Sequence, residues 1–332
     1  MKKRILLLPA AVIVLGIAFL VGFHVYLERW SEEPLPVAEE IVFIVEPASS
    51  FNALAHMLGK RGVANPWLFS QLAQKHGLQT AVQSGEYRVA PGETPWALLD
   101  RLTRGDVVRY RFLVVEGSTI ATVLDELQAD RRIEFDLAGV VRGDLMERLD
   151  LPPGDPEGRF FPDTYQFKRG HKASSLLRRA NHRMNAVLGE CWAGRDKDTA
   201  FETRDEALIL ASIIEKETGL AADRPRVAGV FVRRLARGWR LQSDPTVIYG
   251  LGSAFDGNLT RAHLADDDNK HNTYRHHGLP PTPIALPGRA AIEAALHPAD
   301  GEELYFVSRG DGSSEFSTDL EDHNKAVRRY QR

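Results

Sequence analysis

The chain has almost no cysteine and no large excess of charge of either sign. Cys191 is the only thiol among 332 residues, so no disulfide can form within one chain and the fold must depend on its hydrophobic core. Lysine and arginine number 42 against 45 acidic residues, and the net charge of −3 argues against a nucleic-acid-binding protein. The sequence also lacks internal repeats and low-complexity tracts. The remaining composition, 43% hydrophobic and 26% charged, is that of a globular protein long enough for two domains.

Long uncharged runs are absent as well, except at the N-terminus. Residues 5–23 carry no charge, and a stretch of roughly 20 apolar residues can span a bilayer as a helix. Basic residues at 2–4 precede this run, so we expect a transmembrane anchor within residues 1–30, with a cytoplasmic N-terminus and the rest of the chain outside. A cleaved signal peptide is the alternative, but no small-x-small cleavage site follows the run.

A proline-containing linker at 31–40 is expected to lead into an α+β domain over residues 41–135. Its most distinctive part is 85–102, where a strand, a Pro-Gly turn, an N-cap at Thr94 and an amphipathic helix follow one another. This unit resembles the first half of a LysM repeat, a small module associated with N-acetylglucosamine polymers. The alternative is a strand–helix unit without a ligand. The other elements expected in this domain are a strand at 40–46, helices at 50–60 and 66–76, a strand at 107–115 and a helix from 117 to about 128.

Residues 136–332 are expected to form a second, mixed α/β domain. We place the boundary in the charged, irregular stretch 131–155 or a little earlier. Four aromatic residues within 157–167 either line a sugar site, because aromatic rings stack on pyranose C–H faces, or pin a loop to the core; the core interpretation is favoured. Helices are expected at 174–187, 226–237 and 289–296, with a strand at 304–307 and a closing helix near 322.

The most informative stretch is 203–219, an apolar helical pattern that ends in two acids. Thr203 and Glu206 match a capping box that starts the helix, and Gly219 can adopt the left-handed conformation that ends it. Positions 207–214 are apolar on nearly every side except at Ser212. This pattern predicts a buried central helix that other elements cover.

Glu215 and Glu217 point in different directions from this helix, about 200° apart at about 100° per residue. Glu215 shares its face with the small residues Ala211 and Ser212, which could leave a groove beside its carboxylate. A glutamate between apolar walls resists ionisation and can act as a general acid. The simpler interpretation, which composition alone favours, is that both acids are solvated at a helix end.

Two polar segments further along are also candidates for a site. Asp244 precedes a proline, so we expect it outside a helix, and Thr246 and Tyr249 can project from the next helical turn toward whatever Asp244 faces. Histidines and aspartates are frequent between positions 263 and 277. No spacing among them matches a known ligand pattern, so we expect no metal.

Six motifs follow one another in an order that is typical of one enzyme family. They resemble the successive motifs of the endolytic peptidoglycan transglycosylases of the MltG (YceG-like) family, and the likeness extends from the apolar N-terminal segment nearly to the last residue. The motifs are Glu157-Gly-Arg-Phe-Phe-Pro-Asp-Thr-Tyr165, Ala211-Ser-Ile-Ile-Glu-Lys-Glu-Thr218, Arg240-Leu-Gln-Ser-Asp-Pro-Thr-Val-Ile-Tyr-Gly250, Asn272-Thr-Tyr274, Gly278-Leu-Pro-Pro281 and His323-Asn324.

The resemblance implies an enzyme that cleaves MurNAc-GlcNAc β-1,4 bonds within glycan strands and leaves 1,6-anhydro ends, without a cofactor. Its catalytic glutamate would be Glu215, the first acid of its motif. One carboxyl group can serve both steps, because it can donate a proton to the leaving oxygen and then accept one from the C6 hydroxyl. Side chains that orient the sugar, or alternatively make structural hydrogen bonds, are expected at Glu217, Gln242, Asp244, Thr246, Tyr249, Asn272 and Tyr274.

The resemblance further implies a LysM-like subdomain ahead of the catalytic domain and a single-pass protein of the bacterial inner membrane whose catalytic domain is periplasmic. Its substrate would be peptidoglycan glycan strands, whose polymerisation it would end or trim. Membrane-bound peptidoglycan synthases of the penicillin-binding protein class are candidate partners.

Two other functions remain open at this point. A hydrolase could use Glu215 as the acid and Glu217 or Asp244 as the base. A non-enzymatic wall-binding scaffold could use the LysM-like unit for affinity and the second domain to dock a synthase.

Overall fold

The computed structural model describes residues 2–196 and 200–331, with side chains from residue 11 onward. The chain forms two compact units, Met1–Tyr110 and Arg111–Arg332. Both combine helices with short strands, so the expected α+β class is confirmed. Met1, the first residue of the expected cytoplasmic segment, and Arg332, the last of the expected catalytic domain, lie outside the described residues.

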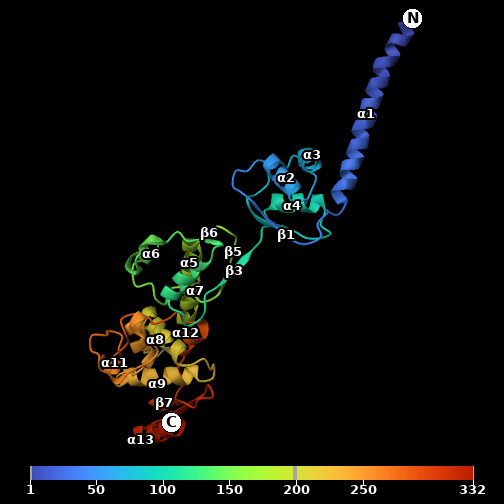
Figure 1. Cartoon of the computed structure of the whole chain (residues 1–332). Coiled ribbons are helices and arrows are strands. Elements are labelled where there is room, and N and C mark those ends of the chain that lie inside the picture. The colour runs from blue at the N-terminus through green and yellow to red at the C-terminus, as the bar shows by residue number, and fades with distance from the viewer. Residues whose placement is uncertain (1, 197–199, 332) are drawn as a thin grey trace. The chain divides into compact units, whose positions relative to one another are not determined.

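The first unit begins with α1 (Lys2–Glu32), a single long helix (Figure 1). Its segment Ala11–Glu32 is long and apolar enough to cross a membrane, with a mean hydropathy of 2.1. Apolar side chains between positions 12 and 21 are exposed on every side of the helix. Further along, Leu27 is buried in the core of this unit and the ring of Phe23 contacts that of Trp67. An apolar helix near the N-terminus agrees with the expected anchor, although a signal sequence has the same composition.

The rest of the first unit is a two-stranded sheet covered by three helices. Strands β1 (Ile41–Val45) and β2 (Gly85–Val89) pair antiparallel, with Phe43 opposite Tyr87 in the core. The three helices contribute their apolar faces to the same core, as the sequence predicted; they are α2 (Phe51–Lys60), α3 (Pro66–Lys75) and α4 (Pro95–Arg104).

The ends of these helices follow local sequence rules. The side chains of Ser50, Asn65 and Thr94 each accept a backbone N–H in the first turn of α2, α3 and α4. At the end of α4, Gly105 adopts the left-handed conformation with φ 66°, which a residue without a Cβ tolerates. These caps explain why the boundaries expected from the sequence lie within one or two residues of those observed.

The second unit begins earlier than the boundary at residue 135 that we expected. Strand β3 (Tyr110–Leu113), whose first residue closes the first unit, pairs with β5 (Thr164–Phe167). At the start of α5 (Ile120–Ala129), the Ile120 N–H donates to Glu157 over 3.0 Å. These bonds attach residues 111–135 to the second unit. Because Glu157 lies 37 residues beyond Ile120, no local pattern reveals the attachment.

The described part of the second unit contains short strands in pairs and helices around a central one. Strands β4 and β6 pair in parallel, whereas β7 and β8 form a hairpin beside α13. The remaining strands are β4 (Ile133–Glu134), β6 (His171–Lys172), β7 (Tyr305–Ser308) and β8 (Ser314–Ser317). The remaining helices are α6 (Leu145–Arg148), α7 (Ala173–Ala193), α8 (Arg204–Glu217), α9 (Arg224–Ala236), α10 (Asp244–Leu251), α11 (Arg261–Ala265), α12 (Arg289–Leu296) and α13 (Leu320–Tyr330).

Helix α8 is the centre of this unit, as predicted. Thr203 and Glu206 form the expected capping box, and all residues from 207 to 214 except Ile209 are buried. Helices α7, α9 and α12 pack around it, which accounts for an apolar pattern on nearly every side. The expected stop at Gly219 is wrong: the helix ends at Glu217, and Thr218 is extended, with φ −146° and ψ 131°.

Two other boundaries differ from expectation. The strand expected at 107–115 covers only 110–113, and the helix expected at 174–187 extends to Ala193. Asp244, which we expected outside a helix because a proline follows, is the first residue of α10. A first-turn N–H has no intrahelical acceptor, so Pro245 at the second position removes no hydrogen bond from the helix.

Candidate active site

The end of α8 holds two carboxylates in different surroundings. Glu215 and Glu217 leave the helix in different directions, as the periodicity predicted, and the exposed Lys216 lies between them. The Lys216 ammonium donates to the carbonyl of Gly117 over 3.1 Å. The two acids therefore have to be described separately.

The carboxylate of Glu215 is enclosed, and its side chain is 6% exposed. One oxygen accepts the backbone N–H of Gly288 at 2.8 Å, and the other lies 3.4 Å from the guanidinium of Arg224. Burial raises the pKa of Glu215, and the Gly288 N–H opposes that rise; among the nearby charges Glu116 adds to it and Arg224 opposes it. Glu215 is thus a buried acid held mainly by a backbone donor.

The face of Ala211 and Ser212, beside which we expected a groove at Glu215, packs against another segment of the chain. The segment 284–288 fills it, with Ile284, Ala285 and Leu286 all buried. Ser212 accepts the Ile284 N–H at 2.9 Å and donates to the carbonyl of Ile209. Small residues on a helix face allow another chain segment to approach closely, which is what happens here. The sequence could not show which segment would do so.

The carboxylate of Glu217 lines a cavity of about 480 Å³. Burial raises the pKa of Glu217 to about 7, and the charge of Asp244 adds to that rise. The hydroxyl of Ser243 donates to this carboxylate and opposes the shift. A carboxyl with a pKa about 7 is protonated for about half the time near neutral pH, which suits a group that first gives and then takes a proton.

Three other residues expected at the site line the same cavity: Gln242, Asp244 and Tyr274. The phenol of Tyr274 donates to Asp244 at 2.6 Å, and burial, together with this hydrogen bond, raises the pKa of Tyr274. Gln242 has φ 52°, an uncommon conformation for a residue with a Cβ. Such strain is often found at functional sites. The backbone conformation, as well as the motif, therefore makes the segment around residue 242 a candidate part of the active site.

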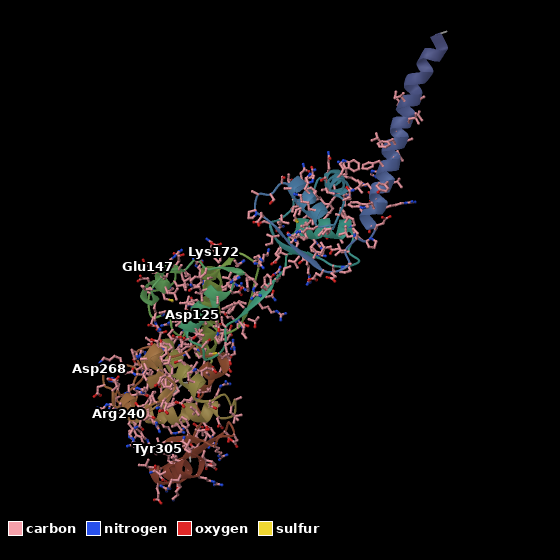
Figure 2. The ribbon with its side chains drawn as sticks, in the orientation of Figure 1. Asp125, Glu147, Lys172, Arg240, Asp268 and Tyr305 are labelled. Atoms are coloured by element: carbon pink, nitrogen blue, oxygen red, sulfur yellow. The ribbon has the colours of Figure 1, made fainter. Side chains whose placement is uncertain are left out.

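The opposite wall of the cavity comes from the C-terminal elements. Tyr305 on β7, labelled in Figure 2, stacks against His323 on α13 with ring centroids 5.1 Å apart. Arg234 on α9 donates to the carbonyls of Leu304 (2.8 Å) and Leu241, which fixes its guanidinium beneath this wall. Burial lowers the pKa of His323. His323 belongs to the last of the six motifs, but no pattern placed it beside Tyr305 or Arg234, because α9, β7 and α13 lie far apart along the chain.

Two expected site residues are buried and bonded to the protein itself. Thr246 is fully buried and its hydroxyl is within hydrogen-bonding distance of the Ser243 carbonyl and of Thr273. Asn272 is also fully buried, and its amide donates to backbone carbonyls of the loop 263–266. These contacts match the structural alternative that we left open for each of them.

Tyr249 lies away from Glu217, beside a buried acid that sequence reasoning missed. Its hydroxyl donates to Glu157 over 3.1 Å and accepts from Arg142, which also bonds to Asp155. Burial raises the pKa of Glu157 to about 6, although the Ile120 N–H and Arg142 oppose the shift. Glu157 is the first residue of the first of the six motifs, but only the aromatic residues of that motif were given a possible role.

Those aromatic residues belong to the core. Phe160, Phe161, Tyr165 and Phe167 are all buried. The Tyr165 hydroxyl donates to the Phe161 carbonyl over 2.7 Å, which closes the loop on itself. The favoured interpretation of this segment is confirmed, and no sugar platform lies among these four rings.

The histidines and aspartates between 263 and 277 make separate local contacts. His263 caps the start of α11, His271 bonds to Thr282, and Asp267 pairs with Arg275. Among the described residues, no group of three or more histidine, cysteine or acidic side chains could hold a metal ion.

The chain is similar to known proteins over most of its length. A profile of the YceG-like family matches residues 43–329. An endolytic murein transglycosylase of Bacillus subtilis (strain 168) is 29% identical over 305 residues, which are 86% of this chain and 83% of that protein. An endolytic murein transglycosylase of Streptococcus pneumoniae serotype 2 (strain D39) is 27% identical over 85% of this chain but only 57% of its own length. A crystal structure of a YceG-like protein from Listeria monocytogenes superimposes with a TM-score of 0.57 at 27% identity, covering 87% of this chain and 99% of that one.

Proposed function

The chain belongs to the YceG-like family, and we propose that it is a lytic transglycosylase that cleaves peptidoglycan glycan strands. The names of its relatives in B. subtilis and S. pneumoniae support the substrate and the enzyme class. The observation that carries the proposal is the cavity at the end of α8, where a carboxyl group with a pKa about 7 lies beside Asp244 and Tyr274.

Glu217 is the acid–base group in this proposal. A glycan strand needs space beside the reacting carboxyl group, and Glu217 is among the residues that line a cavity together with the exposed side chains of Gln242 and Asp244. Glu215, to which the motif resemblance assigned the role, is enclosed by the segments around Gly117 and Gly288. Burial is the main cause of the raised pKa of both carboxyls, so enclosure alone does not exclude Glu215. The cavity that Glu217 lines is the reason to propose Glu217, and Glu215 is the alternative that the experiment must separate.

The reaction needs one carboxyl group and no water. The Glu217 carboxyl gives its proton to the oxygen that links MurNAc C1 to GlcNAc C4, and this C1–O bond breaks. The resulting carboxylate then takes the proton of the muramic acid C6 hydroxyl, whose oxygen bonds to C1. One product has a 1,6-anhydro-MurNAc end, the other has a free C4 hydroxyl on GlcNAc, and the carboxyl is protonated again.

The neighbours of Glu217 suit the charge that develops during this reaction. Asp244 is exposed on the cavity wall, where its carboxylate can stabilise positive charge at the anomeric carbon. The phenol of Tyr274 holds Asp244 at 2.6 Å and so fixes its orientation. Gln242 presents an amide to the same space, suitable for a sugar hydroxyl or N-acetyl group.

Analysis of the digestion products tests the proposal. Purified sacculi are treated with the wild-type chain, E217Q and E215Q, and the soluble fragments are separated by mass. We expect anhydro-muropeptides from the wild-type chain and from E215Q, and none from E217Q. Reducing ends in place of anhydro ends would indicate the hydrolase, and unchanged function of both variants would indicate the scaffold. If E215Q alone loses activity, Glu215 is the acid.

The location of the enzyme is a further part of the proposal. The exposed apolar surface of α1 between positions 12 and 21 suits a bilayer, so the helix would anchor the protein in the bacterial inner membrane, with the chain that follows it in the periplasm. From there it would cut strands that membrane-bound synthases extend. The LysM-like unit at 85–102 would contribute glycan affinity. Membrane fractionation with and without residues 1–30 checks the anchor, because loss of α1 should release the protein.

A further inference from the structure

Helix α3 of the first unit is fixed to the end of α1 at two points. The ring of Phe23 lies against that of Trp67 on the first turn of α3, with the ring centroids 5.2 Å apart. Further along α1, Glu28 forms an ion pair with Lys75, the last residue of α3. Because the two contacts follow the same order along both helices, α3 runs alongside α1 in the same direction. The first turn of α3 is therefore the end nearer to the apolar segment of α1.

The position of Phe23 on α1 sets the depth of Trp67. Phe23 is the last residue of the uncharged run 5–23. At about 1.5 Å per residue this run is about 29 Å long, close to the hydrocarbon thickness of about 30 Å in a bilayer. If α1 crosses a bilayer, Phe23 and the adjacent Trp67 lie at the boundary of the hydrocarbon. Trp67 is 59% exposed, and tryptophan is enriched at this depth because its ring is apolar and its N–H reaches water.

The turn between α2 and α3 belongs to the same end of the unit. Gly59, near the end of α2, approaches Pro66 so closely that a Cβ at position 59 would clash with the proline ring. Lys60 and Arg61 follow Gly59 and are both exposed. The α2–α3 turn, defined as residues 60–67, therefore presents two cations and an indole ring where the unit is closest to the apolar segment of α1.

The sequence around this turn contains no acid. Acidic residues number 45 of 332 in the chain, yet none occurs between Glu46 and Glu86. A cavity of about 520 Å³ beside Trp67 is lined by uncharged polar side chains such as Asn65 and Gln71, and no acid, lysine or arginine is among the described residues that line it. A bilayer with anionic lipids attracts lysine and arginine and repels acids. Amide groups can bond to lipid phosphate and glycerol oxygens, so this surface suits a headgroup layer.

We propose that the α2–α3 turn rests in the headgroup layer on the outer face of the bilayer that α1 crosses. The Trp67 ring lies at the hydrocarbon boundary, and Lys60 and Arg61 face lipid phosphates. This inference rests on the membrane anchor in the proposed function and not on which glutamate reacts. A helix alone leaves the body of the first unit free to tilt, whereas a helix and a second contact fix its orientation on the bilayer.

Quenching of a fluorescent label by lipids tests the proposal on the full chain in vesicles of phosphatidylethanolamine and phosphatidylglycerol. The label is attached to K60C in the turn or to A81C, which follows the other end of α3; both positions are exposed. Cys191 is buried, so labelling of the unsubstituted chain gives the background. The quencher is a lipid that carries a spin label in its headgroup. Extraction of the vesicles at alkaline pH shows whether the chain is inserted.

Replacement of Trp67 tests the contact itself. W67A is compared with W239A, the matched control, because Trp239 is an exposed tryptophan of the second unit. The melting temperature of each variant shows that it is folded. We expect the lipid to quench the label at position 60 much more strongly than the label at position 81. We also expect W67A, but not W239A, to reduce the quenching at position 60.

Three results would count against the proposal. Equal or negligible quenching at the two positions would overturn it and leave the turn free for a protein partner or a second copy of the chain. Unchanged quenching in W67A would also overturn it, because Trp67 would then not hold the turn at the bilayer. Release of the full chain at alkaline pH would reject the anchor, and this inference would fail with it. Absence of anhydro ends from wild-type digests would reject only the proposed reaction.

Discussion

Glu215 and Glu217 are one residue apart, yet their carboxylates meet different parts of the chain. Glu215 accepts an N–H from the buried Gly288 and faces the partly buried Arg224. Glu217 accepts a hydroxyl from Ser243, faces the carboxylate of Asp244 and lines a cavity. Burial raises the pKa of both, so a raised pKa by itself does not identify the reacting acid. Substrate access is the second criterion in our proposal, because a proton donor must come within hydrogen-bonding distance of the atom it protonates.

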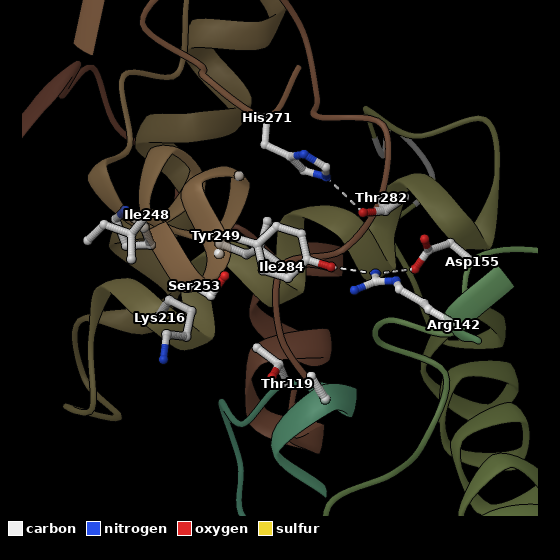
Figure 3. Close-up of a pocket in the computed structure, with 14 residues that line it drawn as sticks. Thr119, Arg142, Asp155, Lys216, Ile248, Tyr249, Ser253, His271, Thr282 and Ile284 are labelled. Carbon is white, nitrogen blue, oxygen red and sulfur yellow. Dashed lines mark hydrogen bonds and ion pairs between the residues drawn. The ribbon is translucent and has the colours of Figure 1, made fainter. Parts of the chain in front are cut away.

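The same comparison shows why two acids so close in sequence can do different work. The Gly288 donor ties the segment 284–288 to the end of α8, and this segment fills the face of Ala211 and Ser212. Glu215 thereby helps to hold the segment whose Ile284 lines a cavity of about 800 Å³ together with Tyr249 (Figure 3). Glu217 is held by the segment that leads into α10, where Asp244 is also placed. In the proposed mechanism, Glu215 supports the architecture and Glu217 reacts with the substrate.

The strongest test of this comparison is the difference in activity between E217Q and E215Q. A general acid–base group contributes about 10²–10⁴-fold to rate, so we expect E217Q to lose at least about a hundredfold in kcat. E215Q keeps an acceptor for the Gly288 N–H and should retain most of the activity. Release of anhydro-muropeptides over time measures both. The reverse order would exchange the roles of the two residues.

Removal of the Tyr274 hydroxyl is expected to have the next largest effect. Y274F loses the 2.6 Å hydrogen bond to Asp244, which costs about 1.5–3 kcal/mol for a bond to a charged acceptor and corresponds to at least about a tenfold loss. Because Asp244 then loses its orientation, the loss should be in kcat more than in KM. Y249F is the matched control, since its hydroxyl bonds to Glu157 and not to the Glu217 side. Equal losses of kcat in the two variants would show that the hydroxyl of Tyr249 matters to the reaction as much as that of Tyr274.

Stability against pH gives a third test that does not depend on substrate. The pKa of Glu217 rises on folding from 4.5 to about 7, so its contribution to stability is present at low pH and is lost as pH rises through about 7. On the order of 2 kcal/mol of unfolding free energy should disappear over this window. E217Q, which cannot ionise, should lack that part of the decrease. Melting temperatures at pH 5 and pH 8 measure it, and identical pH dependence in the two proteins would contradict the burial of this carboxyl.

The sequence predicted the fold where the determinants are local. The capping box at Thr203, the caps at Ser50 and Thr94 and the left-handed glycine at 105 involve neighbouring residues, and these helices begin and end close to where we expected. The unit boundary near residue 110 depends on bonds such as the one from Ile120 to Glu157, which no local pattern contains. Proteins use such long-range contacts to define units, so this error is inherent in reading one sequence.

The candidate site was predictable in part for the same reason. Helical periodicity correctly separated the directions of Glu215 and Glu217, and the motif order correctly indicated the family. Periodicity could not show that the segment 284–288 closes over one acid, or that β7 and α13 leave a cavity beside the other. Side chains such as Thr246 and Asn272 stand in the same motifs as Asp244 and Tyr274 but are buried, Thr246 within α10 and Asn272 in a loop. Motif membership therefore does not distinguish substrate contacts from scaffold.

The smallest expected effect concerns Arg224, the cation that faces Glu215. Arg224 lies 3.4 Å from that carboxylate, and its Nε is buried without a hydrogen-bond partner among the described residues, so the guanidinium acts on Glu215 chiefly by charge. In R224M the opposing charge is lost and the pKa of Glu215 should rise further, which makes stability fall more steeply as pH increases. If Glu215 is structural, the activity below pH 6 should change by no more than about twofold, corresponding to about 0.5 kcal/mol.

The pH profiles of kcat in R224M and S243A show which acid carries the reacting proton. A shift of the alkaline limb in R224M, with the profile of S243A unmoved, would mean that the reacting proton belongs to Glu215. The opposite pattern, with S243A moving the limb upward because Glu217 loses a donor to its charged form, assigns the proton to Glu217.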